Sequence, residues 1–158
     1  MYRQLREASE EMPSLVMSLE ERQAFLAGTH IGVLAVEREG RAPLAVPVWY
    51  HYEPGGEVLI WISRDSVKYK SISRAGRFSF MVQQEEQPYK YVTAEGPTVI
   101  DEPPAADDVL KIARRYESEE EALAYLDTGV GDEEMAIVRM RPEKWLSTDY
   151  SKEEAAGS

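Results

Sequence analysis

The sequence predicts a mainly β protein, a small antiparallel barrel of about six strands with peripheral helices. The first observation is that strand-like apolar runs follow one another, separated by short turns that contain Gly or Pro. The second is that the helical patterns are short, and that two of them come late, before the last strand. The third is that no internal repeat marks a second domain. The expected strands cover 31–37, 43–52, 57–63, 77–84, 89–101 and 135–142.

The first three strands are expected to pair consecutively as antiparallel hairpins. In the fifth, Gly96-Pro97 predicts a bulge or a barrel corner, because proline cannot donate to a ladder and glycine permits a sharp bend.

Capping signals place the helices. A capping box at 18–21 begins a helix that ends at Gly28, with Leu19, Phe25 and Leu26 directed to the core. A central helix is expected after Asp65 or Ser66, the possible N-caps, and it ends at Gly76. Two more helices are expected at about 107–116, with Leu110, Ala113 and Tyr116 in register, and after a second capping box at 118–121. The last ends at Gly129 or Gly131.

Composition limits the classes of protein that the chain can represent. Its 158 residues include no cysteine, which excludes disulfides, thiolate zinc sites and cysteine nucleophiles. The formal net charge of −11 argues against general nucleic-acid binding. We expect a loose N-terminal arm at 1–17, one domain at 18–150 and a tail at 151–158. Without an apolar run of signal-peptide or membrane-spanning length, a soluble cytoplasmic protein is expected, with no membrane partner.

The second strand has two apolar faces. Period two separates the residues Leu44, Val46, Val48, Tyr50 and Tyr52 from Ala45, Pro47, Trp49 and His51. Pro47 places this part of the strand at an edge, at a bulge or beside something other than a strand. Such a strand is packed on both sides, either by the core and a subunit or flat ligand, or between barrel and helix.

Positive charge is concentrated at 61–80, in an otherwise acidic chain. Five of the eighteen basic residues lie there, namely Arg64, Lys68, Lys70, Arg74 and Arg77, against the single acid Asp65. A helical wheel places Lys68 in the middle of the small and apolar arc that Val67, Ser71, Ile72 and Ala75 form. Because Lys68 is also in the first helical turn, an anionic ligand is plausible there. The alternatives are a snorkelling lysine and a structural ion pair.

The sequence shows no catalytic constellation of its own. His30 and His51 have no partner at a spacing that suits a metal site or a triad, and no metal site is expected. Neither a phosphate-loop lysine motif nor G-x-G-x-x-G occurs. This pattern suits a binding module, or an enzyme whose cofactor does the chemistry.

The order of motifs resembles the pyridoxamine 5′-phosphate oxidase-like split β-barrel flavoproteins. The resemblance runs through PLAVPVWY, SRDSVKYKSI, RFSFMVQ, YVTAEGPTVI and MAIVRMRPEKW and covers about residues 18 to 150. It is greatest to the flavin or deazaflavin oxidoreductases of this superfamily, many of which use coenzyme F420 and others FMN. It implies a six-stranded antiparallel split barrel, the FMN-binding type, and a homodimer with the cofactor at the interface.

The resemblance also implies site residues. The cofactor phosphate would lie at Ser63, Arg64, Asp65, Ser66 and Lys68, and the ring would lie along Val46, Pro47, Val48 and Trp49. Gln84, or Gln83, would contact the ring, and Trp145 would reach the site of the partner chain. Many relatives have a second basic residue where this chain has Ser66, and the C-terminus lacks the basic residues of a true pyridoxamine phosphate oxidase. Vitamin B6 oxidation is therefore not expected.

The expected activity is hydride transfer between a bound deazaflavin, F420, and an unsaturated or quinone-like small molecule. An FMN-dependent oxidase or reductase on the same fold is the first alternative. The second is a protein that binds or sequesters a flavin, a deazaflavin or haem without catalysis, with His30 or His51 as an iron ligand in the haem case.

Overall fold

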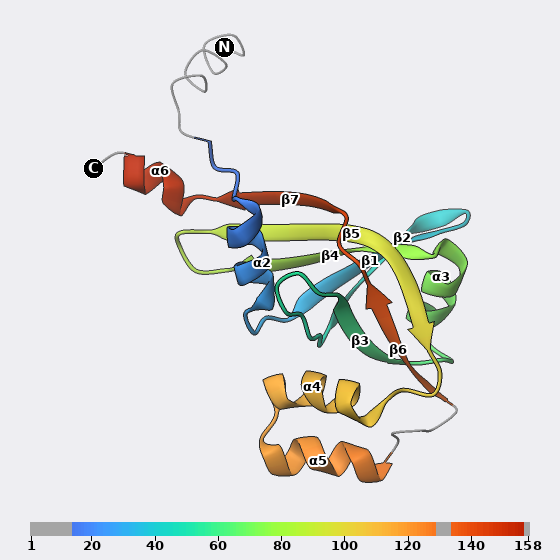
Figure 1. The fold of residues 1–158 in the computed structure, drawn as a ribbon. Coiled ribbons are helices and arrows are strands. Elements are labelled where there is room, and N and C mark those ends of the chain that lie inside the picture. Colours follow the sequence, from blue (N-terminus) through green and yellow to red (C-terminus); the bar gives the residue numbers. More distant parts are fainter. Residues whose placement is uncertain (1–13, 129–133, 157–158) are drawn as a thin grey trace.

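The computed structural model describes residues 14–128 and 134–156, which form one curled antiparallel sheet with helices around it (Figure 1). The strands are β1 (Gly32–Arg38), β2 (Arg41–Val48), β3 (Val58–Ser63), β4 (Arg77–Gln84), β5 (Lys90–Asp101), β6 (Met135–Met140) and β7 (Lys144–Asp149). The helices are α2 (Leu19–Ala27), α3 (Val67–Ala75), α4 (Ala106–Tyr116), α5 (Glu119–Thr128) and α6 (Ser151–Ala156).

Six of these strands follow the order β2-β1-β4-β5-β6-β3, and β7 pairs with β5 outside this path. His51, just beyond β2, forms an isolated bridge with Leu59 of β3 through two backbone hydrogen bonds of 3.0 and 2.9 Å. This bridge connects the two ends of the path, so the predicted barrel with peripheral helices is confirmed. The expected hairpin between the second and third strands is wrong, because β3 takes β6 as its ladder partner over its whole length.

Gly96 lies at the bend of the long strand β5, as its sequence predicted. Up to Pro97 the strand pairs with β4, and from Thr98 onward it pairs with β6. A Cβ atom at Gly96 would lie 1.7 Å from the backbone oxygen of Arg141, which leaves room only for glycine at this position. The bend therefore depends on a close approach of two backbones.

The core fills the inside of the barrel. Its largest fully buried side chains come from most of the elements and include Leu26, Leu34, Tyr50, Tyr52, Ile60, Ile72, Phe80, Ile137 and Met140. Alternate residues of β4, Phe78, Phe80 and Val82, point inward, as the period-two pattern predicted. Leu19, which was expected to face the core, is 53% exposed, because only the face of α2 with Phe25 and Leu26 contacts the barrel.

Both ends of the described chain join the barrel. Met17 is buried, and its backbone N–H donates to Ser147 Oγ at 3.2 Å. Strand β7 and helix α6 were not predicted, since 144–149 was interpreted as a connection and 151–158 as a tail. Lys152 of α6 pairs with Glu21 of α2 at 3.0 Å. Most of the expected arm, residues 1–13, lies outside the described residues.

Helices α4 and α5 form a hairpin between β5 and β6, and α4 packs on β3 (Figure 1). Arg139 of β6 pairs with Asp101 at the end of β5 and with the buried Asp108 of α4, which fixes the start of α4 to the sheet. The predicted capping box between Ser118 and Glu121 is confirmed. The predicted end of α5 at Gly129 or Gly131 lies outside the described residues.

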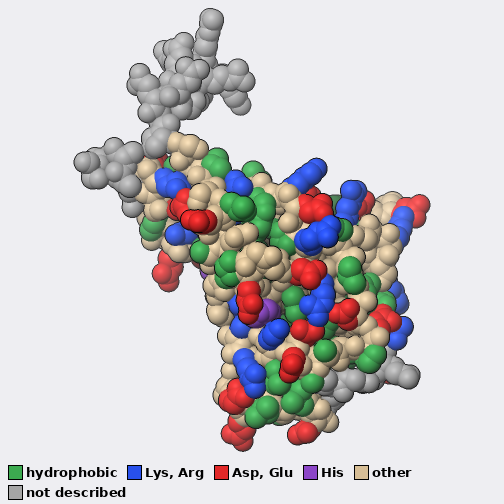
Figure 2. Space-filling model, viewed as in Figure 1, with side chains coloured by type: hydrophobic (Ala, Val, Ile, Leu, Met, Phe, Trp, Pro, Cys, Tyr) green, Lys and Arg blue, Asp and Glu red, His purple; other side chains and the backbone are tan. Residues whose placement is uncertain are grey.

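On the surface that Figure 2 shows, acidic and basic side chains are interspersed and form no large region of one sign. Among residues 14–128 and 134–156, none of the helices has the length and apolar character needed to cross a membrane.

Candidate functional site

A cavity of about 500 Å³ lies where the end of β2, the end of β3, the start of α3 and one face of α4 meet. This volume falls within the usual range of small-molecule and cofactor sites. Six residues that the sequence singled out line it together: Pro47, Val48, Trp49, Ser63, Ser66 and Lys68. Ile31, Trp61, Ile62 and Ile112 complete the lining. The two segments that the sequence identified separately are therefore walls of one cavity.

Ser66 organises the polar end of the cavity. It is the N-cap of α3, and its hydroxyl accepts a hydrogen bond from the Tyr69 N–H at 3.1 Å and donates one to the Ser63 backbone oxygen at 2.6 Å. The helix ends at Gly76, whose φ of 69° is the left-handed conformation expected of a glycine cap. Lys68 lies in the first turn, half-buried, beside the positive end of the helix dipole.

Lys68 differs from three of the basic residues near it. Arg64 pairs with Glu102 at 3.3 Å, Arg77 pairs with Glu37 at 2.7 Å, and Arg74 pairs with Glu39. In the described part of the chain, no carboxylate forms an ion pair with Lys68, and no carboxylate lines the cavity. The structural ion pair considered for this lysine is therefore absent among the described residues. The polar end of the cavity carries the Lys68 ammonium group and the hydroxyls of Ser63 and Ser66. The Ser66 proton is already donated to the Ser63 backbone oxygen, so the ammonium group and the Ser63 hydroxyl are the side-chain donors left for an anion.

Aromatic side chains form the apolar walls. Trp49 follows the end of β2 and stacks on Tyr116 of α4, with ring centroids 4.8 Å apart and an interplanar angle of 10°. Trp61 of β3 meets Tyr125 of α5 edge to face, at 5.6 Å and 89°. Ile112 of α4 joins them in the lining. The helical hairpin thus supports one side of the cavity from outside the barrel.

The other expected site residues lie outside this lining. Val46 packs on the core, Asp65 is exposed, and Arg64 is engaged with Glu102 and lies over the Tyr69 ring at 6.0 Å. Gln84 donates to the backbone oxygen of Pro88 at 2.8 Å and so holds the turn between β4 and β5. Trp145 of β7 is opposite Ala94 and packs on the core.

The wheel prediction for α3 is only partly correct. Ser71 and Ile72 are buried as expected, but Val67 is 57% exposed, since the first turn projects beyond the barrel. The same wheel places Tyr69 on the opposite arc, which was expected to face solvent, but Tyr69 is half-buried and packs on the core.

Four lining residues were missed. Trp61 and Ile62 could have been found, because they directly precede Ser63 in the same strand. Ile31 and Ile112 carried no local signal, since their approach to the cavity depends on how α4 and the chain before β1 pack.

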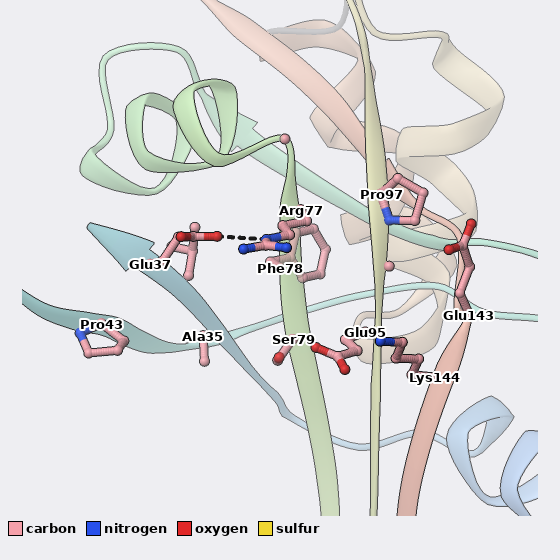
Figure 3. Close-up of a pocket in the computed structure, with 13 residues that line it drawn as sticks. Ala35, Glu37, Pro43, Arg77, Phe78, Ser79, Glu95, Pro97, Glu143 and Lys144 are labelled. Carbon is pink, nitrogen blue, oxygen red and sulfur yellow. Dashed lines mark hydrogen bonds and ion pairs between the residues drawn. The ribbon is translucent and has the colours of Figure 1, made fainter. Parts of the chain in front are cut away.

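A larger cavity of about 690 Å³ lies on the outer side of the sheet (Figure 3). Its walls carry the charged residues Glu37, Arg77, Glu95, Glu143 and Lys144, and the figure shows the Glu37 carboxylate directed at the Arg77 guanidinium across two strands. None of the expected site residues lines it. Three carboxylates make it a poorer place for a phosphate than the smaller cavity.

The two histidines lie outside both cavity linings. His30 Nε2 is 2.9 Å from the Phe25 backbone oxygen, and His51 Nε2 is 3.4 Å from a Glu53 carboxylate oxygen. Burial lowers the pKa of both rings, and the nearby Arg115 guanidinium lowers the pKa of each further.

No family model matches the sequence, and the curated proteins contain no match to it. Solved structures do match its fold. A conserved hypothetical protein from Mycobacterium tuberculosis is 23% identical, with a TM-score of 0.72 over 88% of this chain and 89% of that chain. An F420 reductase is 20% identical, with a TM-score of 0.64 over 78% and 94% of the two chains.

A proposed pyridoxamine 5′-phosphate oxidase from Listeria innocua is 13% identical, with a TM-score of 0.59 over 82% of this chain and 96% of that chain. These identities are low, so the similarity is one of fold. The chain has the split-barrel fold of the pyridoxamine 5′-phosphate oxidase-like proteins, as the order of its sequence motifs indicated.

Proposed function

We propose that the chain is an oxidoreductase that binds a flavin-type cofactor in the cavity between β2, β3, α3 and α4. The observation that carries the proposal is Lys68, half-buried in the first turn of α3 and without a carboxylate partner among the described residues. A phosphate at this end would meet the ammonium group, the Ser63 hydroxyl and the positive end of the helix that Ser66 caps. A flat ring would lie against Pro47, Val48 and Trp49.

The cofactor would supply two-electron hydride chemistry, and the residues of the chain would bind and orient it. The substrate that accepts the hydride and a proton would be an unsaturated or quinone-like small molecule. The walls Ile31, Trp61 and Ile112 would exclude water from the ring face.

F420 is the first candidate, because a protein with the same fold is an F420 reductase. FMN is the second candidate, because the lysine, the Ser63 hydroxyl and the apolar walls would suit either phosphate and either ring. Haem is not favoured, since neither His30 nor His51 lines the cavity.

We further propose a homodimer, for which the outer face of the sheet supplies the surface. Residues in register across five strands form a row on this face that is apolar apart from Thr93, namely Pro47, Val33, Met81, Thr93 and Leu146. Leu146 is 62% exposed. A contiguous apolar surface on a sheet is characteristic of an interface. Pro47 belongs both to this row and to the cavity, so a second copy packed here would border the cofactor site.

The test is a titration of wild type, Lys68→Ala and Lys70→Ala with FMN and with F420. Loss of one charge-assisted contact to phosphate should weaken binding by roughly ten- to a hundredfold in Lys68→Ala. Lys70 is exposed on the same helix and is outside the cavity lining, so Lys70→Ala serves as the matched control. Equal affinity of Lys68→Ala and wild type for both cofactors would contradict the phosphate site, and no binding by wild type would contradict the function.

A further inference from the structure

The geometry assigns to Tyr116 of α4 the role of a positioning residue, which holds the two chain segments that carry Trp49 and Ile31 and so sets the apolar wall of the cavity. The effect of Tyr116 on cofactor binding rests on the proposed function. The claim that Tyr116 holds Trp49 in place concerns the protein without ligand. Tyr116 itself does not line the cavity.

Strand pairing does not fix the orientation of Trp49. Strand β2 ends at Val48, and the next backbone pairing is the isolated bridge at His51. Trp49 thus lies in an unpaired stretch between the two. Its indole is held by the stacked ring of Tyr116, which is nearly parallel to it at a centroid distance of 4.8 Å.

The Tyr116 hydroxyl donates a hydrogen bond to the backbone oxygen of His30 at 2.6 Å and accepts one from the backbone N–H of Tyr50 at 3.2 Å. His30 directly precedes Ile31, and Tyr50 directly follows Trp49. One hydroxyl therefore joins the two backbone groups adjacent to two wall residues of the cavity. Burial raises the pKa of Tyr116, which keeps the hydroxyl protonated as a donor.

Helix α4 also contributes a wall residue of its own. Ile112, one turn before Tyr116 on the same helix, lines the cavity directly. Arg115 fixes the same end of the helix, because it donates to the backbone oxygen of Gly28 and lies 4.9 Å from the centre of the Tyr50 ring. The last turn of α4 thus contributes one wall residue and holds the segments of two others, although it lies far from all of them in the sequence.

The variant Tyr116→Phe tests the assignment, since it retains the stacked ring and removes the hydroxyl. The matched control is Ser147→Ala. Ser147 is also a buried hydroxyl that joins two segments, accepting from the Met17 N–H at 3.2 Å and from Arg22 Nε at 2.8 Å. It lies outside the cavity lining, so its loss should lower stability without altering the wall.

Two measurements test the role of Tyr116, one without ligand and one with FMN. In a Trp61→Phe/Trp145→Phe background, Trp49 is the only tryptophan, and acrylamide quenching of its fluorescence reports its mobility without any ligand. We expect Tyr116→Phe to increase the quenching constant and Ser147→Ala to leave it unchanged. In the protein with all three tryptophans, Tyr116→Phe should weaken FMN binding roughly three- to tenfold, and Ser147→Ala should not weaken it.

Unchanged quenching in Tyr116→Phe would overturn the assignment, and so would increased quenching with unchanged FMN affinity. Failure of wild type to bind either FMN or F420 would instead overturn the proposed function, and quenching would still decide whether Tyr116 holds Trp49. If Tyr116→Phe does not fold, Tyr116→His serves as the second variant, since it retains an aromatic ring and a polar atom. In that variant quenching must also rise, because the hydroxyl that joins the two segments is lost.

Discussion

His30 and His51 share one electrostatic environment although they are far apart in the sequence, because both are partly buried near Arg115. Burial is the main cause that lowers their pKa, and the positive guanidinium adds to it. Lys111 acts on His51 in the same direction, whereas Glu53 opposes the shift. The folded protein therefore favours the neutral form of both rings, as the region that joins α4 to the barrel already holds a positive charge.

This arrangement predicts a stability that falls in mild acid. A histidine whose folded pKa is below its unfolded value of 6.5 binds its proton more readily in the unfolded chain. The free energy of unfolding should therefore be highest above about pH 6.5, and it should decline as the pH falls through the lowered pKa of the folded protein. Urea unfolding between pH 7.5 and 5 measures the decline, and His51→Gln should reduce its slope. Parallel curves for wild type and His51→Gln would contradict the prediction. The exposed Glu21, whose pKa is lowered to about 2, acts only in a more acidic range.

At the level of the element, Ser66 is the N-cap of helix α3, and the proposed function places it beside the phosphate as well. Ser66→Ala removes the acceptor for the Tyr69 N–H and should cost about 1 kcal/mol of unfolding free energy. Ser66→Asp keeps an N-cap acceptor, so the stability should remain near that of wild type. Its carboxylate beside Lys68 would repel a phosphate, and FMN affinity should fall by an order of magnitude or more. Chemical denaturation and FMN titration of the two variants separate the roles. An Asp variant that binds FMN as wild type does would be inconsistent with a phosphate at this helix end.

The boundaries of α3 could be predicted because both signals are local: Ser66 caps the first turn, and Gly76 adopts the left-handed conformation. The polar half of the candidate site follows from the same few residues. Strand β7 carried no such signal, because its inward-facing Ser147 and Asp149 are polar whereas its outward-facing Leu146 is apolar, which reverses the alternation expected of a strand. The contribution of α4 could not be predicted either, since it depends on packing between residues more than sixty positions apart.

Across the whole molecule, the candidate site brings together four separate parts of the chain. The barrel supplies the ends of β2 and β3, α3 supplies the cation, and the α4–α5 hairpin supports the aromatic walls. The bridge between His51 and Leu59 holds the ends of the barrel together next to the cavity. Closure of the barrel therefore fixes the distance between Trp49 and Ser63, which lie at the apolar and the polar end of the cavity.

The outer face of the sheet leads to the last prediction, which concerns assembly. Wild type should have a mass in solution of twice the chain mass of 17.9 kDa, since the apolar row from Pro47 to Leu146 would be covered by a second copy. Leu146→Glu places a charge in this row and should produce a monomer with weakened FMN binding, because the partner borders the cofactor site. Leu123→Glu changes an apolar residue of α5 that is 43% exposed, away from this face, and should remain a dimer. Light scattering after size-exclusion chromatography measures the masses. A wild-type monomer, or a Leu146→Glu dimer, would show that this face is not the interface.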